Sequence, residues 1–371
     1  MRPNASTPPQ AIESVVLMPP EAPPLASEKP AKAERRGQRL VEIDALRGLA
    51  ALAVVLFHYT THFTELYQPA SPPAASLPFG FYGVNLFFIV SGFVIFMTLE
   101  RTRRPMDFVV SRFSRLFPAY WLAIVLTFSV THWLGLPDRL VDLGAAIGNL
   151  TMLQGLLHIP HVDGVYWTLE VELLFYVGML SLYRLGGLGR IHLALASMLG
   201  LRLVYFVLAY FAGIDLPWIA YRLLILAYLP WFALGVSVYL LVNPRTAQDR
   251  PRSLALAAGA IGTLLVAEAL LLGLLAAALA GLVYLAASGR APWLRHRTLA
   301  WLGAISYPLY LIHENIGWAV QLRVLALGGS TDLSVLVALT LSLLLATAMT
   351  RWAEQPAMRW IRRRYRERSS G

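Results

Sequence analysis

The chain has 371 residues, of which 57% are hydrophobic and only 14% are charged, and its mean hydropathy is +0.59. Soluble globular domains carry about 25% charged residues, so this composition indicates a protein that crosses a membrane several times. The net charge of +10 comes from arginines at the ends of apolar segments, a pattern typical of membrane topology rather than of a nucleic-acid-binding surface. The sequence contains no cysteine, which excludes disulfides, cysteine-ligated metals and thiol nucleophiles.

Residues 1–39 differ from the rest of the chain in being rich in Pro, Ala, Ser, Glu and Lys. They contain no apolar stretch of signal-peptide length, so we expect a disordered cytoplasmic tail. A membrane domain is expected over residues 40–356, followed by a basic cytoplasmic tail over 357–371. Aromatic residues are interspersed among the arginines of this second tail, which also allows an amphipathic helix lying on anionic headgroups.

Apolar segments long enough to cross a bilayer occur about ten times. They lie near residues 44–64, 80–99, 116–134, 166–184, 191–211, 219–241, 253–268, 270–287, 299–320 and 333–351. The stretch 253–287 is too long for one crossing and is divided at Glu268, its only charged residue. Residues 141–158 are apolar but interrupted by glycine and amide residues, so a partial or re-entrant helix is expected there. The sequence therefore predicts an all-α polytopic membrane protein.

The arginines between these segments predict the orientation of the chain. With the amino terminus in the cytoplasm, most arginines of the connecting loops and the arginine-rich carboxyl terminus are cytoplasmic as well. The opposite side then receives only Arg139, Arg222 and Arg323. This asymmetry follows the positive-inside rule, so both termini are predicted to be cytoplasmic.

The first apolar segment carries an acid, a base and a histidine on one helix face. At 100° per residue, the eleven steps from Arg47 to His58 return to within about 20° of the starting direction, and Asp44 lies about 40° from His58. Charged groups are costly in lipid, so these side chains are expected to face the protein interior. Catalysis is the favoured role, with His58 as general base, because imidazole titrates near neutral pH. A structural histidine bonded to a backbone carbonyl is the alternative.

Arg112 and Arg115 lie at i and i+3 in SRFSRLFPAYW, at the cytoplasmic entrance of an apolar helix. Two guanidinium groups on one face could bind the phosphates of a nucleotide-bearing donor. Simple anchoring by the positive-inside rule is an equally good interpretation of this pair.

Thr168, Glu172 and Tyr176 recur at intervals of four in VYWTLEVELLFYV and so share a helix face. Glu172 lies deep in the span and requires an arginine partner or a proton, so structural and proton-transfer roles both remain open. Glu170 points elsewhere, nearer the outer boundary, where solvation is expected. No metal site is expected, because no HExxH or similar ligand pattern occurs.

Ser306, Tyr310 and His313 follow one another at i, i+4 and i+7 in AISYPLYLIHENIGW. Pro308 predicts a kink of the kind found where a pocket opens. The three polar side chains either bond helices together or contact a substrate. In FFIVSGFVIF, the pair Ser91 and Gly92 predicts a close helix approach or a local break near the active cavity.

Taken in order, the segments IDALRGLAALAVVLFH, FYGVNLFFIVSGFVIF, RFSRLFPAYW, WTLEVELLFY, SYPLYLIH and EQP resemble the acyltransferase-3 family of integral membrane acyltransferases. This family includes bacterial O-antigen and exopolysaccharide O-acetylases. The resemblance extends over residues 43–356, and Thr168 stands where the family usually has serine.

The resemblance implies that residues 40–356 form a membrane acyltransferase domain in the inner membrane of a bacterium. Its reaction would transfer an acyl group, usually acetyl from acetyl-CoA, to a hydroxyl of a surface carbohydrate, glycolipid or small molecule. His58 matches the essential histidine of the family and Arg47 its partner, while Arg112 and Arg115 match the arginine pair associated with the acyl-CoA donor. Glu172, Tyr176 and His313 are expected to orient the reacting groups, and direct transfer and an acyl-histidine intermediate both remain open.

A transporter or flippase for a polar solute or glycan is the alternative function. Polar stripes in spanning helices and a proline-kinked helix serve such proteins equally well. The helix pattern shows no inverted repeat, which weakens this alternative.

Overall fold

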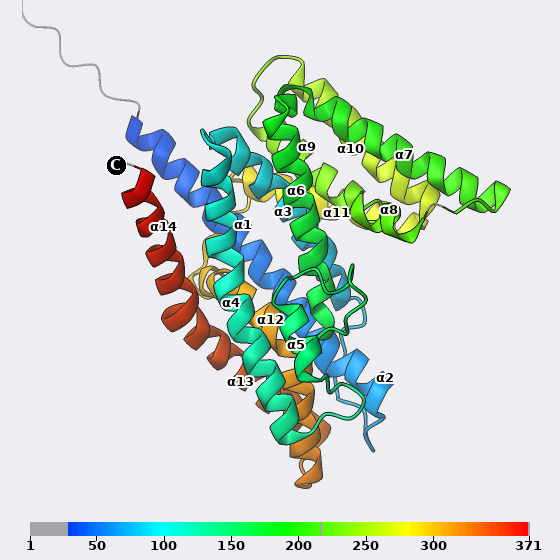
Figure 1. The fold of residues 1–371 in the computed structure, drawn as a ribbon, viewed down its shortest axis with the longest axis vertical. Coiled ribbons are helices and arrows are strands. Elements are labelled where there is room, and N and C mark those ends of the chain that lie inside the picture. Colours follow the sequence, from blue (N-terminus) through cyan, green and yellow to red (C-terminus); the bar gives the residue numbers. More distant parts are fainter. Residues whose placement is uncertain (1–28, 216, 370–371) are drawn as a thin grey trace, which may run out of the picture.

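The computed structural model describes residues 29–215 and 217–369, and within these ranges every regular element is a helix (Figure 1). Six helical stretches of this part of the chain are long and apolar enough to cross a membrane. They are Gly80–Arg101, Pro105–Leu134, Gly164–Arg184, Gly187–Ala212, Leu270–Ala287 and Thr331–Arg368. An all-α protein with several candidate spans is thereby confirmed, whereas the count of about ten stays a prediction.

The first helix, α1 (Lys29–Phe57), begins earlier than expected. It continues through a π-helical turn, η1 (His58–His62), into the short helix α2 (Phe63–Tyr67). The prediction of disorder over residues 1–39 is therefore wrong for residues 29–39, which are helical, and its remainder lies outside the described residues.

The remaining elements form a bundle of helices joined by short turns (Figure 1). They are η2 (Gly80–Tyr82), α3 (Gly83–Arg101), α4 (Pro105–Leu134), α5 (Leu143–Asn149), η3 (Gly164–Tyr166), α6 (Trp167–Arg184), η4 (Gly187–Arg190), α7 (Ile191–Ala212), α8 (Trp218–Leu223), α9 (Leu229–Val242), α10 (Asp249–Ala267), α11 (Leu270–Ala287), η5 (Pro292–Arg295), α12 (Arg297–Ala326), α13 (Thr331–Met349), η6 (Thr350–Glu354) and α14 (Gln355–Ser369).

The single helix predicted over residues 219–241 is wrong. The chain forms α8 and α9 instead, separated by a turn in which Ile225 has a φ of 47°. A β-branched residue rarely adopts this left-handed conformation, so the turn is a true break. Pro230 is the second residue of α9, a first-turn position where a proline costs nothing because its nitrogen would have no hydrogen-bond partner there.

Two other local predictions are confirmed. The chain breaks at Glu268, which follows α10 and accepts a hydrogen bond from Arg202 of α7. The interrupted segment 141–158 forms only the seven-residue helix α5 followed by turns.

Small residues let the central helices approach closely. An added Cβ at Gly48 of α1 would lie 2.5 Å from the backbone nitrogen of Gly303 in α12. Likewise, a Cβ at Gly235 of α9 would lie 1.9 Å from the carbonyl oxygen of Ile89 in α3. Gly92 of α3 meets Phe232 of α9 in the same way, so Gly92 marks a close approach and not a local break, since α3 runs through it.

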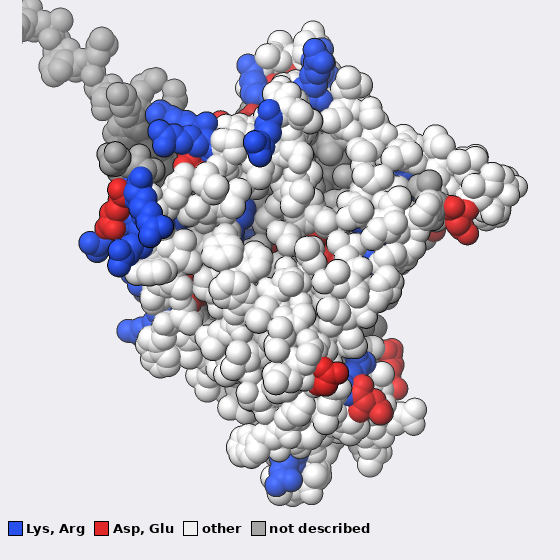
Figure 2. Space-filling model, in the orientation of Figure 1, with Lys and Arg blue, Asp and Glu red and all other residues white. Residues whose placement is uncertain are grey.

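Charged side chains gather at the ends of the molecule. Figure 2 shows Lys and Arg mainly at the end that holds α14 and the start of α1, with a broad, nearly uncharged band below it. This is the distribution from which the cytoplasmic location of both termini is predicted.

Candidate functional site

His58 lies in the π-helical turn η1, at the contact between α1 and α12. Its Nδ1 atom is 2.9 Å from the carbonyl oxygen of Val54 and 3.2 Å from Nε2 of His313. The indole nitrogen of Trp318 donates a hydrogen bond to the His58 carbonyl oxygen at 2.9 Å. Single π-helical turns are frequent at functional sites, because they redirect one side chain without ending the helix.

The hydrogen bonds around the two histidines define their neutral tautomers. Nδ1 of His313 lies 2.7 Å from the Tyr310 carbonyl oxygen, which only accepts, so His313 carries its proton on Nδ1 and accepts on Nε2. Nδ1 of His58 faces the Val54 carbonyl and this accepting nitrogen, so it is the protonated atom of His58. The lone pair of His58 therefore resides on Nε2, the form required of a general base.

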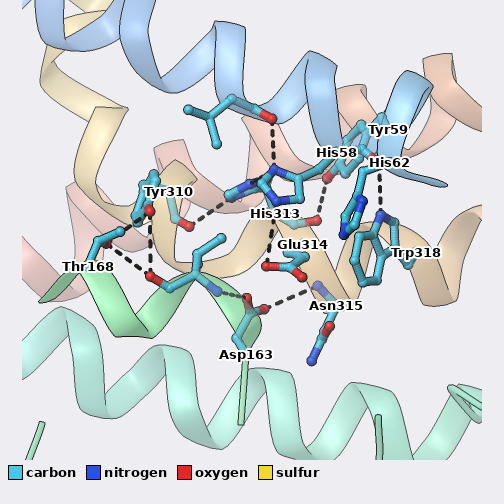
Figure 3. Close-up of polar contacts among 12 residues, drawn as sticks. His58, Tyr59, His62, Asp163, Thr168, Tyr310, His313, Glu314, Asn315 and Trp318 are labelled. Atoms are coloured by element: carbon cyan, nitrogen blue, oxygen red, sulfur yellow. Dashed lines mark hydrogen bonds and ion pairs between the residues drawn. The ribbon is translucent and has the colours of Figure 1, made fainter. Parts of the chain in front are cut away.

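One buried carboxyl group, that of Glu314, faces this lone pair, and a second, that of Asp163, lies beside Glu314 (Figure 3). Oε2 of Glu314 is 3.8 Å from Nε2 of His58, and the two side chains are 5% and 13% exposed. Asp163, fully buried in the loop before α6, accepts hydrogen bonds from the backbone nitrogens of Asn315 and Val165 at 3.1 and 3.3 Å. Burial, followed by the negative charge of Glu314, raises the pKa of Asp163.

The sequence interpretation missed both acids. For Glu314 a signal was present, because a carboxylate directly follows His313 in an otherwise apolar helix. For Asp163 there was none, since it lies in a loop and meets Glu314 only through the fold.

Aromatic and basic side chains surround the far side of His58. The Trp318 ring is 5.4 Å from the His62 ring and 5.8 Å from the Tyr67 ring. The guanidinium carbon of Arg139 lies 5.2 Å from the Trp318 ring centroid. A hydroxyl compound reaching His58 from this side would meet these groups.

A cavity on the other side gathers most of the polar residues that the sequence singled out. Its lining includes Arg47, Arg112, Arg115, Thr168, Glu172, Tyr176, Ser306 and Tyr310. His58, His313 and Asp44 are not among the lining residues. Asp44 is half exposed and pairs with Arg47 at 3.4 Å, one turn away on α1. The structure thus brings five residues of the α6 and α12 stripes together with Arg47 and the arginine pair, and leaves Asp44, His58 and His313 outside the cavity lining.

The two arginines from α4 that line the cavity, Arg112 and Arg115, differ in their partners. Arg115 pairs at 3.2 Å with Glu354, which is buried in the second π-helical turn, η6. Arg112 donates to the hydroxyl groups of Thr98 and Ser111, each at 3.3 Å. Arg112 is therefore held by neutral groups and keeps its charge available for an anion.

Glu172 forms no ion pair with an arginine among the described residues. Its Oε1 atom accepts hydrogen bonds from the hydroxyl groups of Ser91 and of Tyr176, the latter at 2.6 Å. Glu170, expected to be solvated, is instead fully buried, pairs with Arg222 at 2.6 Å and accepts from the Leu156 nitrogen. That expectation is wrong because the loop after α5 and the helix α8 cover this side of α6.

The inner end of the cavity approaches His58 through two rings. The hydroxyl groups of Tyr310 and Thr168 lie 2.9 Å apart. The His313 ring is 5.6 Å from the Tyr310 ring and 5.0 Å from the His58 ring (Figure 3). Ser306 lies farther along α12 and donates to the Gly303 carbonyl oxygen at 2.8 Å. Within the described residues, no group of three or more His, Asp or Glu side chains could hold a metal ion.

Comparison with known proteins identifies the family. The acyltransferase-3 family model, described as an acyltransferase domain, matches residues 40–351. Protein 2 in the picA locus of Rhizobium radiobacter is 36% identical over 135 residues, which cover 33% of this chain and 65% of that protein. The exopolysaccharide production protein ExoZ of Rhizobium meliloti is 28% identical over 118 residues, covering 30% of this chain and 37% of that protein.

The O-acetyl transferase of Shigella phage Sf6 is 28% identical over 147 residues, which cover 36% of this chain and 43% of that protein. The matched segments thus span less than two thirds of each of these three relatives. No solved structure matches the chain significantly. Because the family model matches most of its length, the chain belongs to the acyltransferase-3 family.

Proposed function

We propose that this protein transfers an acyl group, most simply acetyl, from acyl-CoA to a hydroxyl of a surface carbohydrate or related acceptor at the inner membrane of a bacterium. One observation carries the proposal: a single cavity is lined by Arg47, Arg112 and Arg115 and also by Tyr310, and only the His313 ring, which contacts the rings of both Tyr310 and His58, lies between Tyr310 and His58. The names of two relatives, an exopolysaccharide production protein and an O-acetyl transferase, agree with it.

The cavity suits a donor with one anionic and one uncharged end. Guanidinium groups bind phosphate oxygens through paired hydrogen bonds, which assigns the nucleotide of CoA to Arg112 and Arg115. Ser91, Glu172 and Tyr176 line the path between the two ends, where they could bond the amides of the pantetheine arm. The thioester then lies near Thr168 and Tyr310. A rotation of the Tyr310 side chain away from Thr168 would open a path along which the thioester could reach His58.

His58 is the proposed base. Its Nε2 atom removes the proton of the acceptor hydroxyl while the hydroxyl oxygen attacks the thioester carbonyl carbon. The carbon–sulfur bond then breaks, and the thiolate receives the proton from the imidazolium, so that the products are the ester and CoA. An alternative route begins with attack of Nε2 itself on the thioester carbonyl carbon, which breaks the carbon–sulfur bond, expels CoA thiolate and gives an acyl-histidine. The acceptor hydroxyl then attacks the acyl carbon, the carbon–nitrogen bond breaks, and the hydroxyl proton passes to the thiolate, so that the products are again the ester and CoA.

Glu314 is proposed to stabilise the imidazolium that forms on proton transfer. Its carboxylate is 3.8 Å from Nε2, which is too far for a hydrogen bond but close enough for a strong charge interaction at a buried site. The acceptor hydroxyl would lie to one side of the two atoms, where its oxygen can come within hydrogen-bond distance of Nε2.

The test uses the purified full-length chain in detergent with radiolabelled acetyl-CoA. CoA is expected to raise the unfolding temperature, and acetyl-CoA is expected to be hydrolysed slowly or transferred to an added glycan acceptor. Solute counterflow in vesicles that does not depend on CoA, together with an unfolding temperature that CoA does not change, would favour the transporter and overturn the proposal.

A further inference from the structure

The carboxyl-terminal helix α14 packs onto the first turns of α4 (Figure 1). Arg362 donates from Nε to the Ser114 hydroxyl at 3.0 Å and from Nη2 to the Ser111 carbonyl oxygen at 3.3 Å. The Tyr365 hydroxyl donates to Asp107 at 2.8 Å. The segment predicted as a basic cytoplasmic tail is therefore a docked helix, with one arginine turned toward α4.

This docking brings Arg362 beside the arginines of the cavity. Arg112 and Arg362 bond the same residue, Ser111, one through its hydroxyl and the other through its carbonyl oxygen. Grouped cations repel one another, so their assembly in a folded protein favours the binding of an anion.

Carboxylates offset only part of this charge. Arg115 pairs with Glu354. Arg112 and Arg362, in contrast, bond only hydroxyl and carbonyl groups among the described residues, and Nε of Arg112 is buried without a hydrogen-bond partner. Two guanidinium groups with unused donors thus lie next to the entrance of the cavity.

We propose that Arg362 is a third phosphate-binding arginine, which acts with Arg112 and Arg115 on the diphosphate and 3′-phosphate of the CoA nucleotide. This inference rests on the proposed function. The nucleotide would bind where α14 meets α4, with the pantetheine arm entering the cavity past Arg115. The role of α14 is then to complete the donor site.

The experiment compares donors of different length on Arg362→Gln. For acetyl-CoA, KM is expected to rise about tenfold, the effect of losing a charge-assisted hydrogen bond to phosphate, with kcat nearly unchanged. For S-acetyl-pantetheine, which carries no phosphate, KM is expected to equal that of the wild type. Arg362→Lys, which keeps the charge, is expected to recover part of the loss.

Two variants separate charge from docking. Arg363→Gln removes an exposed arginine of the same helix, which pairs with Glu367 at 2.7 Å, and Tyr365→Phe removes the docking bond to Asp107 without changing the charge. In both variants, the ratio of KM for acetyl-CoA to KM for S-acetyl-pantetheine is expected to equal that of the wild type. Three results would overturn this inference and leave the proposed function standing. Arg362→Gln could raise KM equally for both donors, or Arg363→Gln could raise KM for acetyl-CoA as much as Arg362→Gln does. The rise in KM could also depend on the anionic lipid content of the vesicles. A wild-type protein that does not use acetyl-CoA would refute the proposed function as well.

Discussion

Nε2 of His58 and Oε2 of Glu314 face each other at 3.8 Å across the contact between α1 and α12. The histidine can accept a proton at this atom, and the carboxylate is close enough to stabilise the cation that results. Trp318 holds the His58 carbonyl from the same helix that carries Glu314, so α12 positions both the backbone and the charge around the base.

Glu314→Gln is therefore expected to lower kcat about a hundredfold, the range typical of a group that supports general base catalysis, while KM for the donor changes little. Steady-state acyl transfer by the purified variant measures both constants. Glu65→Gln serves as the control, because Glu65 lies 3.4 Å from His62 but is exposed. A Glu314→Gln variant with wild-type kcat would show that the carboxylate has no part in the reaction.

Asp163 predicts a dependence of stability on pH. Because its pKa is raised by burial and by Glu314, the folded protein keeps this proton at pH values where the unfolded chain has lost it. The free energy of unfolding should therefore fall as the pH rises above about 4, the ordinary pKa of Asp. Asp163→Asn, which has no such proton, should show a shallower fall in unfolding temperature across the same pH series. Identical slopes in the two proteins would contradict this assignment.

The helix contact at Gly235 should not tolerate a methyl group. The Cβ of Gly235→Ala would overlap the backbone of α3 at Ile89, and only a shift of a whole helix could relieve it. We expect a loss of stability of about 1–3 kcal/mol or more, seen as a lower unfolding temperature and less monodisperse protein. Gly178→Ala, with no atom near its added Cβ, should be neutral or slightly stabilising. A stable Gly235→Ala variant would mean that α3 and α9 are not in backbone contact.

The pair of Glu170 and Arg222 should stabilise the region around α8. Removal of the arginine in Arg222→Gln leaves Glu170 fully buried and unpaired, which typically costs about 3–5 kcal/mol. Arg323→Gln, at an exposed position, should cost little. The double variant Arg222→Gln with Glu170→Gln should regain much of the lost unfolding temperature. If it does not, the loss in Arg222→Gln is not caused by an unpaired charge on Glu170.

The helical faces could be predicted from sequence because they depend only on the periodicity of one segment. The spacing of Thr168, Glu172 and Tyr176 correctly placed Glu172 and Tyr176 in mutual contact, and Ser306 and Tyr310 share a cavity with them. The family, too, was predicted from ordered motifs and is confirmed.

Contacts between distant segments could not be predicted in this way. Nothing near Asp163 in the sequence indicates Glu314. Glu170 was expected to be solvated because it faces away from Glu172 near the outer boundary, and its contact with Arg222 depends on the fold. The turn at Ile225 depends on packing around it, which apolar periodicity does not encode. Residues 29–39 have the composition of a tail, yet they continue α1, since a helix already formed can be extended at little cost.

The most direct test of the central claim is acyl transfer by His58→Ala, measured as CoA released per enzyme with donor and acceptor present. His132→Ala is the matched control: the His132 ring bonds the Phe128 carbonyl four residues back, as the His58 ring bonds that of Val54, but His132 is exposed. We predict that His58→Ala binds CoA and keeps its unfolding temperature within a few degrees, but loses at least about a thousandfold in kcat. His132→Ala should match the wild type. Wild-type turnover by folded His58→Ala would contradict the account.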